Sequence, residues 1–314
     1  MPRARGYSML ISIVIPVYNN EGSLAPTHEL ISSVFAKDLP DCQLEIVFVN
    51  DGSRDGSYDR LLQLREQDKR VKVLSFTRNF GQMAAMLAGF NEATGDAVIN
   101  ISADLQDPIE LMPEMVGRWK GGAEIVAGYR KSREDPLLAR VFSRMAYGLM
   151  RVTLPSLPQG GFDYVLMDRK VMDFFNSVDV RHRFFQGDLL WSGYRVSFIP
   201  YARRCREHGT SQYTFFKKLK NLFDALLDSS YLPIRFISLM GILTSFAGLL
   251  YSGTVVAAWY MGGTPFTGFA PIMIAIMLVG GMIMTMLGIL GEYVWRIYDE
   301  IRKKPNYLIR DRLD

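Results

Sequence analysis

Short apolar runs alternate with longer amphipathic runs in the first part of the chain. The apolar runs are rich in β-branched residues, and they predict strands at 10–17, 44–50, 71–76, 96–101 and 124–128. The amphipathic runs between them predict helices at 23–35, 61–67, 81–93 and 109–119. Strands this apolar, separated by helices, are typical of a mostly parallel sheet that is covered on both faces. The pattern therefore predicts an α/β domain.

Polar side chains follow four of these strands, at the point where each strand ends. They are Tyr18-Asn19-Asn20-Glu21, Asp51-Gly52-Ser53, Arg78-Asn79 and Asp104-Leu105-Gln106-Asp107. The carboxyl ends of parallel strands meet at one edge of a sheet, where open α/β sheets bind their ligands. We therefore expect one crevice to receive carboxylates, amides, an aromatic ring and an arginine.

The last of these segments carries the ligands of a candidate metal site. Asp104, Gln106 and Asp107 offer hard oxygen atoms, which Mg²⁺ or Mn²⁺ accepts while waters and substrate phosphates complete its coordination shell. The same residues also fit a polar turn between a strand and a helix, with an aspartate as the helix cap. The sequence contains no G-x-G-x-x-G after the first strand, no P-loop motif and no H-E-x-x-H. Dinucleotide, P-loop and zinc-peptidase sites are therefore not indicated.

Composition adds a membrane to this picture. Of the 314 residues 49% are hydrophobic, the mean hydropathy is +0.07 and the net charge is +4, so a nucleic-acid partner is not indicated. No Asp, Glu, Lys, Arg or His occurs between Arg235 and Glu292. Within that stretch, 236–261 and 266–291 are each longer than the ~20 residues that a spanning helix needs. These segments predict two transmembrane helices.

Basic residues flank the apolar stretch. Lys217, Lys218 and Lys220 lie among regularly spaced apolar residues within 214–232, which predicts an amphipathic helix at the membrane interface. Lys and Arg also lie beyond the outer ends of the two apolar segments and are absent from their short connection. The positive-inside rule therefore places both termini on the cytoplasmic side of an inner membrane.

Several short motifs occur together along the chain. They are Pro16-Val17-Tyr18-Asn19, Asn50-Asp51-Gly52-Ser53, Arg78-Asn79-Phe80-Gly81, Ala103-Asp104-Leu105-Gln106-Asp107-Pro108 and, farther on, Gly291-Glu292-Tyr293, Arg296-Ile297-Tyr298 and Lys304-Pro305-Asn306-Tyr307. The first four resemble the motif series of family 2 glycosyltransferases, which have a GT-A fold. The last three resemble the tail of the polyprenyl-phosphate branch, which includes bactoprenol glucosyltransferases, undecaprenyl-phosphate aminoarabinose transferases and dolichyl-phosphate mannose synthases. The similarity covers nearly the whole chain.

The resemblance implies a nucleotide-sugar site in the crevice. Besides the metal-site residues described next, the residues assigned to it are Pro16, Tyr18, Asn20, Glu21, Asp51, Arg78 and Arg206. Pro16, Tyr18 and Asp51 would line the nucleotide base. Relatives usually have Glu at the position of Asn20, and Glu21 comes next, so whether Asn20 or Glu21 reaches the base stays open.

The resemblance also implies that Asp104 and Gln106 bind the metal and the diphosphate. The family usually has Asp where Ser102 stands. A serine hydroxyl can hydrogen-bond a phosphate or a metal-bound water, but it supplies no charge. We therefore expect Ser102 to contribute to the nucleotide-sugar site while the metal has one carboxylate fewer.

Residues of the middle section resemble those that handle the acceptor. Asp163 matches a family aspartate that faces the acceptor, and we interpret it as an orienting residue or a base. Arg130 and Arg133 follow the fifth predicted strand and could clamp the lipid phosphate, although they also fit a solvated basic loop. Arg206 and Ser211 lie in a segment that resembles a loop closing on donor phosphates, and Ser211 is assigned to the lipid phosphate.

These observations combine into one expected organisation. A cytoplasmic GT-A domain would span 1–213, an amphipathic juxtamembrane helix 214–232, a transmembrane hairpin 233–298 and a cytoplasmic tail 299–314. The chain would move one sugar from a nucleotide sugar to polyprenyl phosphate with Mg²⁺ or Mn²⁺, by an inverting single displacement. A UDP-linked donor is favoured, and a GDP-linked donor stays open. We also expect a homo-oligomer.

Two alternatives remain. One is a non-enzymatic nucleotide-binding membrane protein that assists a flippase, although two spans without interior charges offer no obvious polar path. The other is a glycosyltransferase with an acceptor that is not a lipid.

Overall fold

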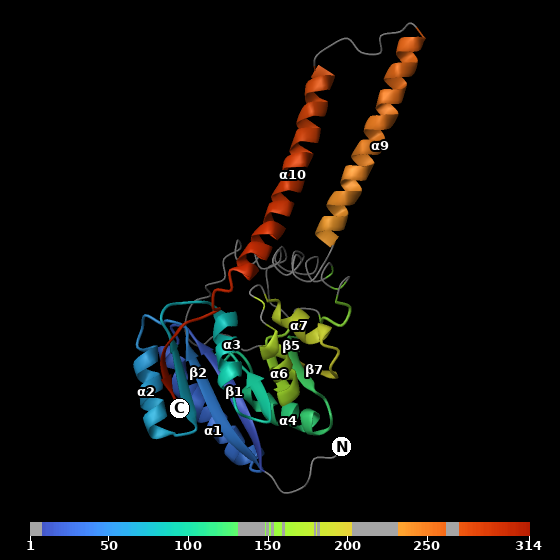
Figure 1. The fold of residues 1–314 in the computed structure, drawn as a ribbon. Coiled ribbons are helices and arrows are strands. Elements are labelled where there is room, and N and C mark those ends of the chain that lie inside the picture. Colours follow the sequence, from blue (N-terminus) through green and yellow to red (C-terminus); the bar gives the residue numbers. More distant parts are fainter. Residues whose placement is uncertain are drawn as a thin grey trace. The chain divides into compact units, whose positions relative to one another are not determined.

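The apolar runs of the chain form strands that hydrogen-bond into one sheet in the computed structural model (Figure 1). The structure describes residues 8–130, 148, 151, 154–158, 161–178, 180, 183–202, 232–261 and 270–314. Within these residues the sheet has eight strands in the order β7-β5-β6-β4-β1-β2-β3-β8. Their bounds are β1 Met9–Val17, β2 Cys42–Asn50, β3 Val71–Phe76, β4 Ala97–Asn100, β5 Ile125–Arg130, β6 Tyr164–Asp168, β7 Val196–Tyr201 and β8 Ile309–Leu313.

The sheet is mostly parallel, as the sequence predicts. β1 pairs in parallel with β2 and β4, β2 with β3, and β5 with β7. β6 runs antiparallel to both β4 and β5, and β8 runs antiparallel to β3. The carboxyl ends of β1, β2, β3 and β4 therefore lie along one edge of the sheet. This is the mixed α/β sheet expected for a GT-A fold.

Helices cover both faces of the sheet because side chains alternate along each strand. Ile11, Ile13 and Ile15 on β1 belong to a buried cluster that includes apolar residues of α1, α2 and α4. Val14 points to the opposite face, where Gly89 of α3 lies against it. The helix bounds in this unit are α1 Glu21–Asp38, α2 Ser57–Gln67, α3 Gln82–Glu92, α4 Met112–Lys120, α6 Arg169–Ser177 and α7 Phe185–Trp191.

The helix predicted at 109–119 begins differently from the expectation. A 3-10 turn, η1, occupies Ile109–Leu111, and the α-helix begins only at Met112. Pro113 stands in the first turn of α4, where a missing N–H costs no intrahelical hydrogen bond.

The last strand was not anticipated. The sequence predicts a tail at 299–314, whereas in the structure Ile309–Leu313 pairs with β3 at the edge of the sheet. Along β8, Ile309, Asp311 and Leu313 are half-buried and the two arginines between them are exposed. Three charged residues in a five-residue strand hide the apolar alternation by which strands are found in a sequence.

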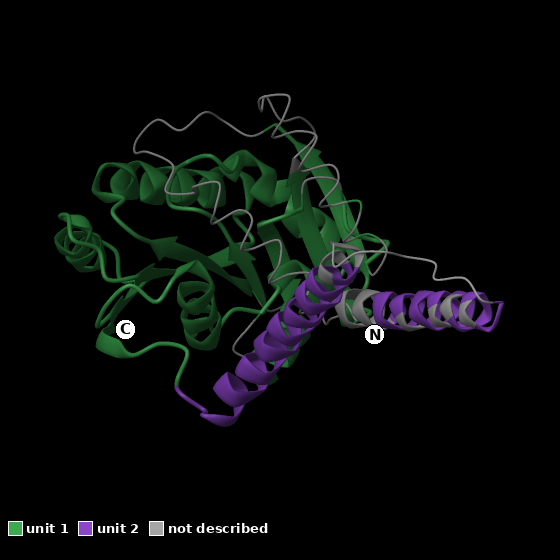
Figure 2. Ribbon diagram, turned by 90° about the horizontal axis from the view of Figure 1, so that it is seen from above, with its two compact units in different colours: residues 1–222, 305–314 green, residues 223–304 purple. Residues whose placement is uncertain are grey.

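The chain divides into two compact units, residues 1–222 with 305–314 and residues 223–304 (Figure 2). The second unit contains the helices α9 (Leu232–Tyr260) and α10 (Ala270–Ile301). Leu239–Ala258 and Ala275–Ile301 have mean hydropathies of 1.6 and 1.8, and both are long and apolar enough to cross a membrane. The predicted amphipathic helix at 214–232 lies outside the described residues, except for Leu232 at the start of α9.

Candidate functional site

A cavity of about 340 Å³ lies at the carboxyl ends of β1, β2 and β3. The turns after these three strands supply most of its walls, and the last residues of β2 and β3, together with α2 and β8, supply the rest. Its lining residues are Tyr18, Asn50, Gly52, Ser53, Arg54, Tyr58, Ser75, Phe76, Thr77, Arg78, Asn79, Arg310 and Asp311. Tyr18 and Arg78 are therefore brought together, as the sequence predicts for residues that follow neighbouring parallel strands.

The turns around the cavity are closely packed at Gly52. Its φ of +65° lies in the left-handed region, and a Cβ there would be 2.5 Å from the carbonyl carbon of Arg78. Only glycine combines this backbone conformation with such a close approach. Gly52 therefore allows the turn after β2 to lie directly against the segment after β3.

Asp51 joins the same two segments by hydrogen bonds. Its Oδ1 accepts from the backbone N–H of Phe80 at 2.6 Å, and its Oδ2 accepts from the N–H of Gly81 at 2.9 Å. The residue is 3% exposed, and burial raises the pKa of its carboxyl although both N–H donors oppose that shift. Asp51 does not line the cavity, so its carboxylate holds the loop that carries Arg78 in place.

Asn20 and Glu21 connect the turn after β1 to the turn after β2 by hydrogen bonds. The side-chain oxygen of Asn20 accepts from the backbone N–H of Tyr18 at 3.0 Å, and the backbone N–H of Asn20 donates to the Ser57 hydroxyl at 2.9 Å. The carboxylate of Glu21 accepts from the backbone N–H of Gly56 at 3.1 Å. Neither residue lines the cavity, so in this structure both side chains orient the turns around Tyr18.

The segment after β4 is built around Ser102. Its hydroxyl lies 2.8 Å from Oδ1 of Asp104 and 2.6 Å from Oδ2 of Asp107, and its backbone N–H donates to the same Asp107 oxygen at 3.1 Å. The hydroxyl of Tyr201 donates to the other Asp107 oxygen at 2.9 Å. Leu105 between the two aspartates has a φ of +59°, an uncommon conformation for a residue with a side chain. Asp107 therefore fixes the shape of the loop, and Asp104 is presented on it.

This loop fits a divalent cation that takes few protein ligands. Asp104 is half-buried, and its Oδ1 accepts from the backbone N–H of Gln106 at 3.3 Å; Gln106 itself is 8% exposed. Among the described residues, no group of three His, Cys, Asp or Glu residues is placed to hold a metal ion. Mg²⁺ is commonly held by one or two carboxylates, with waters and substrate phosphates as its other ligands. The half-buried carboxylate of Asp104 matches that requirement for one ligand, whereas the side chain of Gln106 is largely buried.

Asp163 lies beside the same loop although it is distant in sequence. It immediately precedes β6, and its carbonyl accepts from the side-chain amide of Asn100 at 3.0 Å, at the end of β4. The exposed carboxylate of Asp163 accepts from Nε2 of Gln186 at 3.3 Å. The antiparallel pairing of β6 with β4 therefore brings Asp163 to the edge of the sheet from which the Ser102–Asp107 loop leaves.

The remaining predicted residues are less fully described. Pro16 is half-buried within β1 and is not among the residues that line the cavity. Arg130 is the last residue of β5, and the structure describes only its backbone. Arg133, Arg206 and Ser211 lie outside the described residues.

Several residues of the cavity wall are not predicted from the sequence, and three of them, Tyr58, Arg310 and Asp311, come from outside the turns after the strands. Tyr58 lies on the first turn of α2, which begins at Ser57, four residues before the predicted helix start at 61. The two residues of β8 lie in the segment interpreted as a tail. In the sequence, the two arginines alternate with Ile309, Asp311 and Leu313, which is a weak local signal of a strand.

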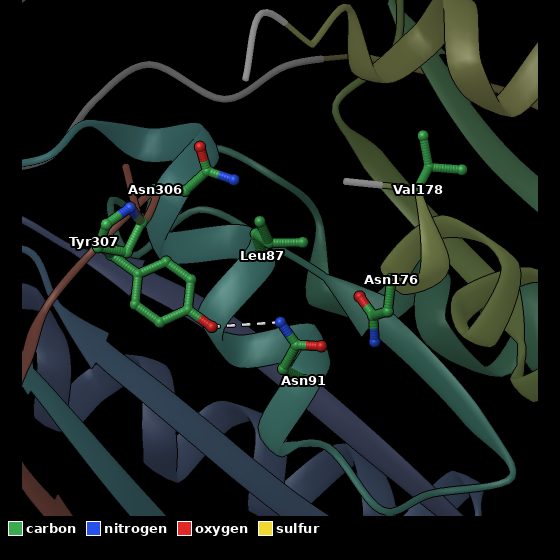
Figure 3. A pocket seen from close by; sticks show the side chains of 7 residues that line it. Leu87, Asn91, Asn176, Val178, Asn306 and Tyr307 are labelled. Carbon is green, nitrogen blue, oxygen red and sulfur yellow. Dashed lines mark hydrogen bonds between the residues drawn. The ribbon is translucent and has the colours of Figure 1, made fainter. Parts of the chain in front are cut away.

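A second cavity, of about 360 Å³, lies between α3, the end of α6 and residues 305–307 (Figure 3). Asn91 of α3 donates a hydrogen bond to the hydroxyl of Tyr307 at 3.2 Å, and Asn176 lies across the cavity from this pair. The ring of Tyr307 stacks on Phe76 of β3 at a centroid distance of 5.1 Å. Residues 305–307 are thus held on the first unit just before β8 begins.

Comparison with known proteins identifies relatives along the whole chain. The model of the family "Glycosyl transferase family 2" matches residues 12–173. An uncharacterised glycosyltransferase of Synechocystis sp. is 34% identical over 96% of this chain and 95% of its own length. The bactoprenol glucosyl transferase of Shigella phage SfX is 33% identical over 97% of this chain and 100% of its own length. Among solved structures, glucosyl-3-phosphoglycerate synthase from Mycobacterium tuberculosis with Mn²⁺, UDP-glucose and phosphoglyceric acid has a TM-score of 0.49 at 18% identity, over 68% of this chain and 76% of that one.

Proposed function

Because the chain belongs to the family 2 glycosyltransferases, we propose that it transfers one sugar from a UDP-linked donor to polyprenyl phosphate at the cytoplasmic face of a membrane. The observation that carries the proposal is that relatives named bactoprenol glucosyl transferase match almost the entire chain, including both apolar helices. In this proposal the donor binds at the cavity and the Asp104 loop. The two helices, which are long and apolar enough to cross a membrane, favour a lipid acceptor.

The cavity suits the nucleotide part of the donor. Tyr18 offers an aromatic ring on which a base can stack, and the Arg78 guanidinium offers hydrogen bonds to anionic oxygens. In this proposal Asp51 acts indirectly. Its carboxylate accepts hydrogen bonds from the N–H groups of Phe80 and Gly81 and so holds the loop that carries Arg78.

The leaving nucleotide diphosphate carries most of the charge that the site must stabilise. Asp104 and Gln106 would hold Mg²⁺ or Mn²⁺, which neutralises diphosphate charge when bound. Ser102 and Asp107 keep Asp104 in position through the hydrogen bonds of the loop. We assign Arg206 to the same diphosphate as a further positive charge.

The acceptor phosphate needs little help from a base. A phosphomonoester has a second pKa near ~6, so it is largely a dianion at neutral pH and can attack without losing a proton. One of its oxygens forms the bond to the anomeric carbon as the bond from that carbon to the diphosphate oxygen breaks, which inverts the configuration. Asp163, held by Gln186, would orient the acceptor, and Arg130, Arg133 and Ser211 would contact its phosphate.

The topology of the sheet supports an even number of membrane crossings. The strands β1 to β7 come before α9 and β8 comes after α10, and β8 joins them in one sheet by pairing with β3. If the two helices span a membrane, both of their outer ends must therefore lie on the same side. The flanking Lys and Arg residues favour the cytoplasmic side.

The test is sugar transfer by the full-length protein in detergent with undecaprenyl phosphate, Mg²⁺ or Mn²⁺, and a panel of radiolabelled UDP- and GDP-sugars. We expect label in the lipid extract with a UDP-sugar. Asp104→Asn should lower the rate at least ~100-fold, as expected when a ligand to the charge-stabilising group is lost. The matched control is Asp59→Asn, an exposed aspartate of α2 that does not line the cavity.

Three results would contradict the proposal in different ways. Label that stays with water-soluble or protein products would indicate another acceptor. Nucleotide binding without transfer to any acceptor would favour the non-enzymatic alternative. Full activity of Asp104→Asn, with an unchanged melting temperature, would remove the metal assignment.

A further inference from the structure

The C-terminal strand β8 forms one wall of the cavity assigned to the donor. Arg310 and Asp311 line this cavity together with residues of the turns after β1, β2 and β3. The chain reaches β8 only after passing through α9 and α10. A residue from the far end of the chain therefore faces the same space as Tyr18 and Arg78.

Both residues are placed by specific hydrogen bonds. Nη2 of Arg310 donates to the carbonyl of Thr77 at 3.0 Å, just after the end of β3. The carboxylate of Asp311 accepts from the hydroxyl of Tyr58 at 3.0 Å. The first bond uses a single nitrogen of a guanidinium that carries five N–H donors. The bond to Thr77 thus holds the guanidinium of Arg310 at one nitrogen, and the residue is still exposed where it lines the cavity.

Several contacts hold the strand against the first unit. Tyr307 stacks on Phe76 and accepts a hydrogen bond from Asn91 (Figure 3). Arg312 forms an ion pair with Glu92 at 3.2 Å. The guanidinium of Arg65 also bonds to the backbone carbonyl of the last residue. The position of β8 therefore depends on aromatic, polar and charged contacts in addition to its pairing with β3.

The charge of the cavity wall favours an anionic ligand. Three arginines (54, 78 and 310) and one aspartate (311) line it among the described residues, which gives a formal charge of +3 − 1 = +2. Without Arg310 this charge would fall to +1. Arginine is well suited to bind phosphate and other anionic oxygens because its planar guanidinium donates paired hydrogen bonds.

We propose that Arg310 is a donor-binding residue, supplied by the C-terminal strand, which contacts the nucleoside diphosphate part of the sugar donor. Asp311 and Tyr58 position the strand for this contact. The donor site is then complete only once the chain has passed through the apolar hairpin and β8 has paired with β3. This inference rests on the proposed function, because it takes the cavity as the donor site.

The test measures UDP binding to the full-length protein in detergent by isothermal titration calorimetry, with GDP titrated in parallel. Arg310→Ala should raise the dissociation constant for UDP about tenfold or more, as expected for the loss of a charge-assisted hydrogen bond. Arg310→Gln, which keeps most of the length of the side chain, serves if the alanine variant does not fold. The matched control is Arg60→Ala on α2, since the Arg60 side chain donates a hydrogen bond to Gln63 and does not line the cavity, and among the described residues it forms no hydrogen bond or ion pair with β8.

The outcomes separate this inference from the proposed function. Weaker UDP binding by Arg310→Ala supports the inference if the melting temperature of the nucleotide-free protein and the UDP binding by Arg60→Ala are both unchanged. Equal binding by Arg310→Ala and the parent overturns it and leaves the proposed function intact. If the parent binds neither UDP nor GDP, the proposed donor site fails and the inference fails with it.

Discussion

Asp51→Asn tests whether a buried carboxylate holds the loop after β3 in place. The two oxygens of Asp51 each accept from a different backbone N–H, those of Phe80 and Gly81. An asparagine offers one acceptor oxygen and one NH₂ group. The backbone N–H of either Phe80 or Gly81 would therefore face the NH₂ group, which is itself a donor. The substitution keeps the shape of the side chain, and therefore the perturbation is confined to the hydrogen bonds and the charge.

The expected cost follows from the burial of this site. A buried N–H without an acceptor costs about 1–3 kcal/mol. Burial raises the pKa of Asp51, which means that the charged carboxylate is itself penalised, so removing the charge recovers part of this cost. We expect a net loss of about 1–2 kcal/mol. If the loop opens instead of leaving the N–H unpaired, this energy appears as a ~5–30-fold weaker binding of UDP, because Arg78 moves with the loop.

The assay combines thermal unfolding in detergent with UDP titration, and Asp59→Asn serves as the control. The raised pKa adds a pH signature. A protonated Asp51 has lost one acceptor in the same way as asparagine. The parent should therefore lose UDP affinity on acidification at a pH above the ordinary aspartate range near ~4, and Asp51→Asn should lack that step. An Asp51→Asn variant that matches the parent in both melting temperature and UDP affinity would refute the reasoning.

Two further predictions concern stability, and thermal unfolding in detergent measures both. Gly89→Ala should destabilise the first unit by about 1–3 kcal/mol, because its Cβ would lie 2.3 Å from Cγ1 of Val14. In Gly117→Ala the new Cβ would meet no side chain or other segment within 4 Å, so this variant should be neutral or should stabilise α4 by up to about 1 kcal/mol. Equal melting temperatures for the two variants would contradict this packing argument. Asp68→Asn should cost about 1 kcal/mol at pH 7 after allowance for solvent screening, since hydrogen bonds from Arg70 hold the pKa of Asp68 well below its usual range. Because the pKa of Asp68 is lower in the folded state, its stabilisation is complete above the unfolded pKa near ~4 and is lost as the pH falls from there toward the folded pKa. The difference in stability between parent and variant should therefore shrink below about pH 4, and a constant difference would count against this reasoning.

Local patterns in the sequence determined most of the elements and the class of the protein. β3 occupies the predicted range at 71–76, and β1 begins one residue before the predicted Leu10. The apolar segments at 236–261 and 266–291 form helices long enough to span a membrane, apart from residues 262–269, which lie outside the described residues. These features follow from periodicity and composition within a few turns of chain, so they can be read without knowledge of contacts. The motifs after the strands also led to the family to which the chain belongs.

The tertiary structure decided which of these polar residues share a space and what each one bonds. The resemblance assigns the carboxylate of Asp51, and that of Glu21 or the amide of Asn20, to the nucleotide, and the fold adds that both carboxylates accept hydrogen bonds from backbone N–H groups. The hydrogen-bond partner of a carboxylate depends on which donor lies within about 3 Å of its oxygens in the folded chain. No local sequence pattern specifies that distance.

The same holds for contacts between distant segments. Tyr58 and Asp311 are 253 residues apart in the chain, yet their side chains are hydrogen-bonded at the cavity. Asp163 reaches the end of β4 only because β6 turns antiparallel to it. Strand pairing across such separations is set by the packing of the whole sheet, and the charged residues of β8 give little local sign of it. The sequence alone therefore determined the parts and their chemistry, and the fold determined that the end of the chain closes the cavity formed near its beginning.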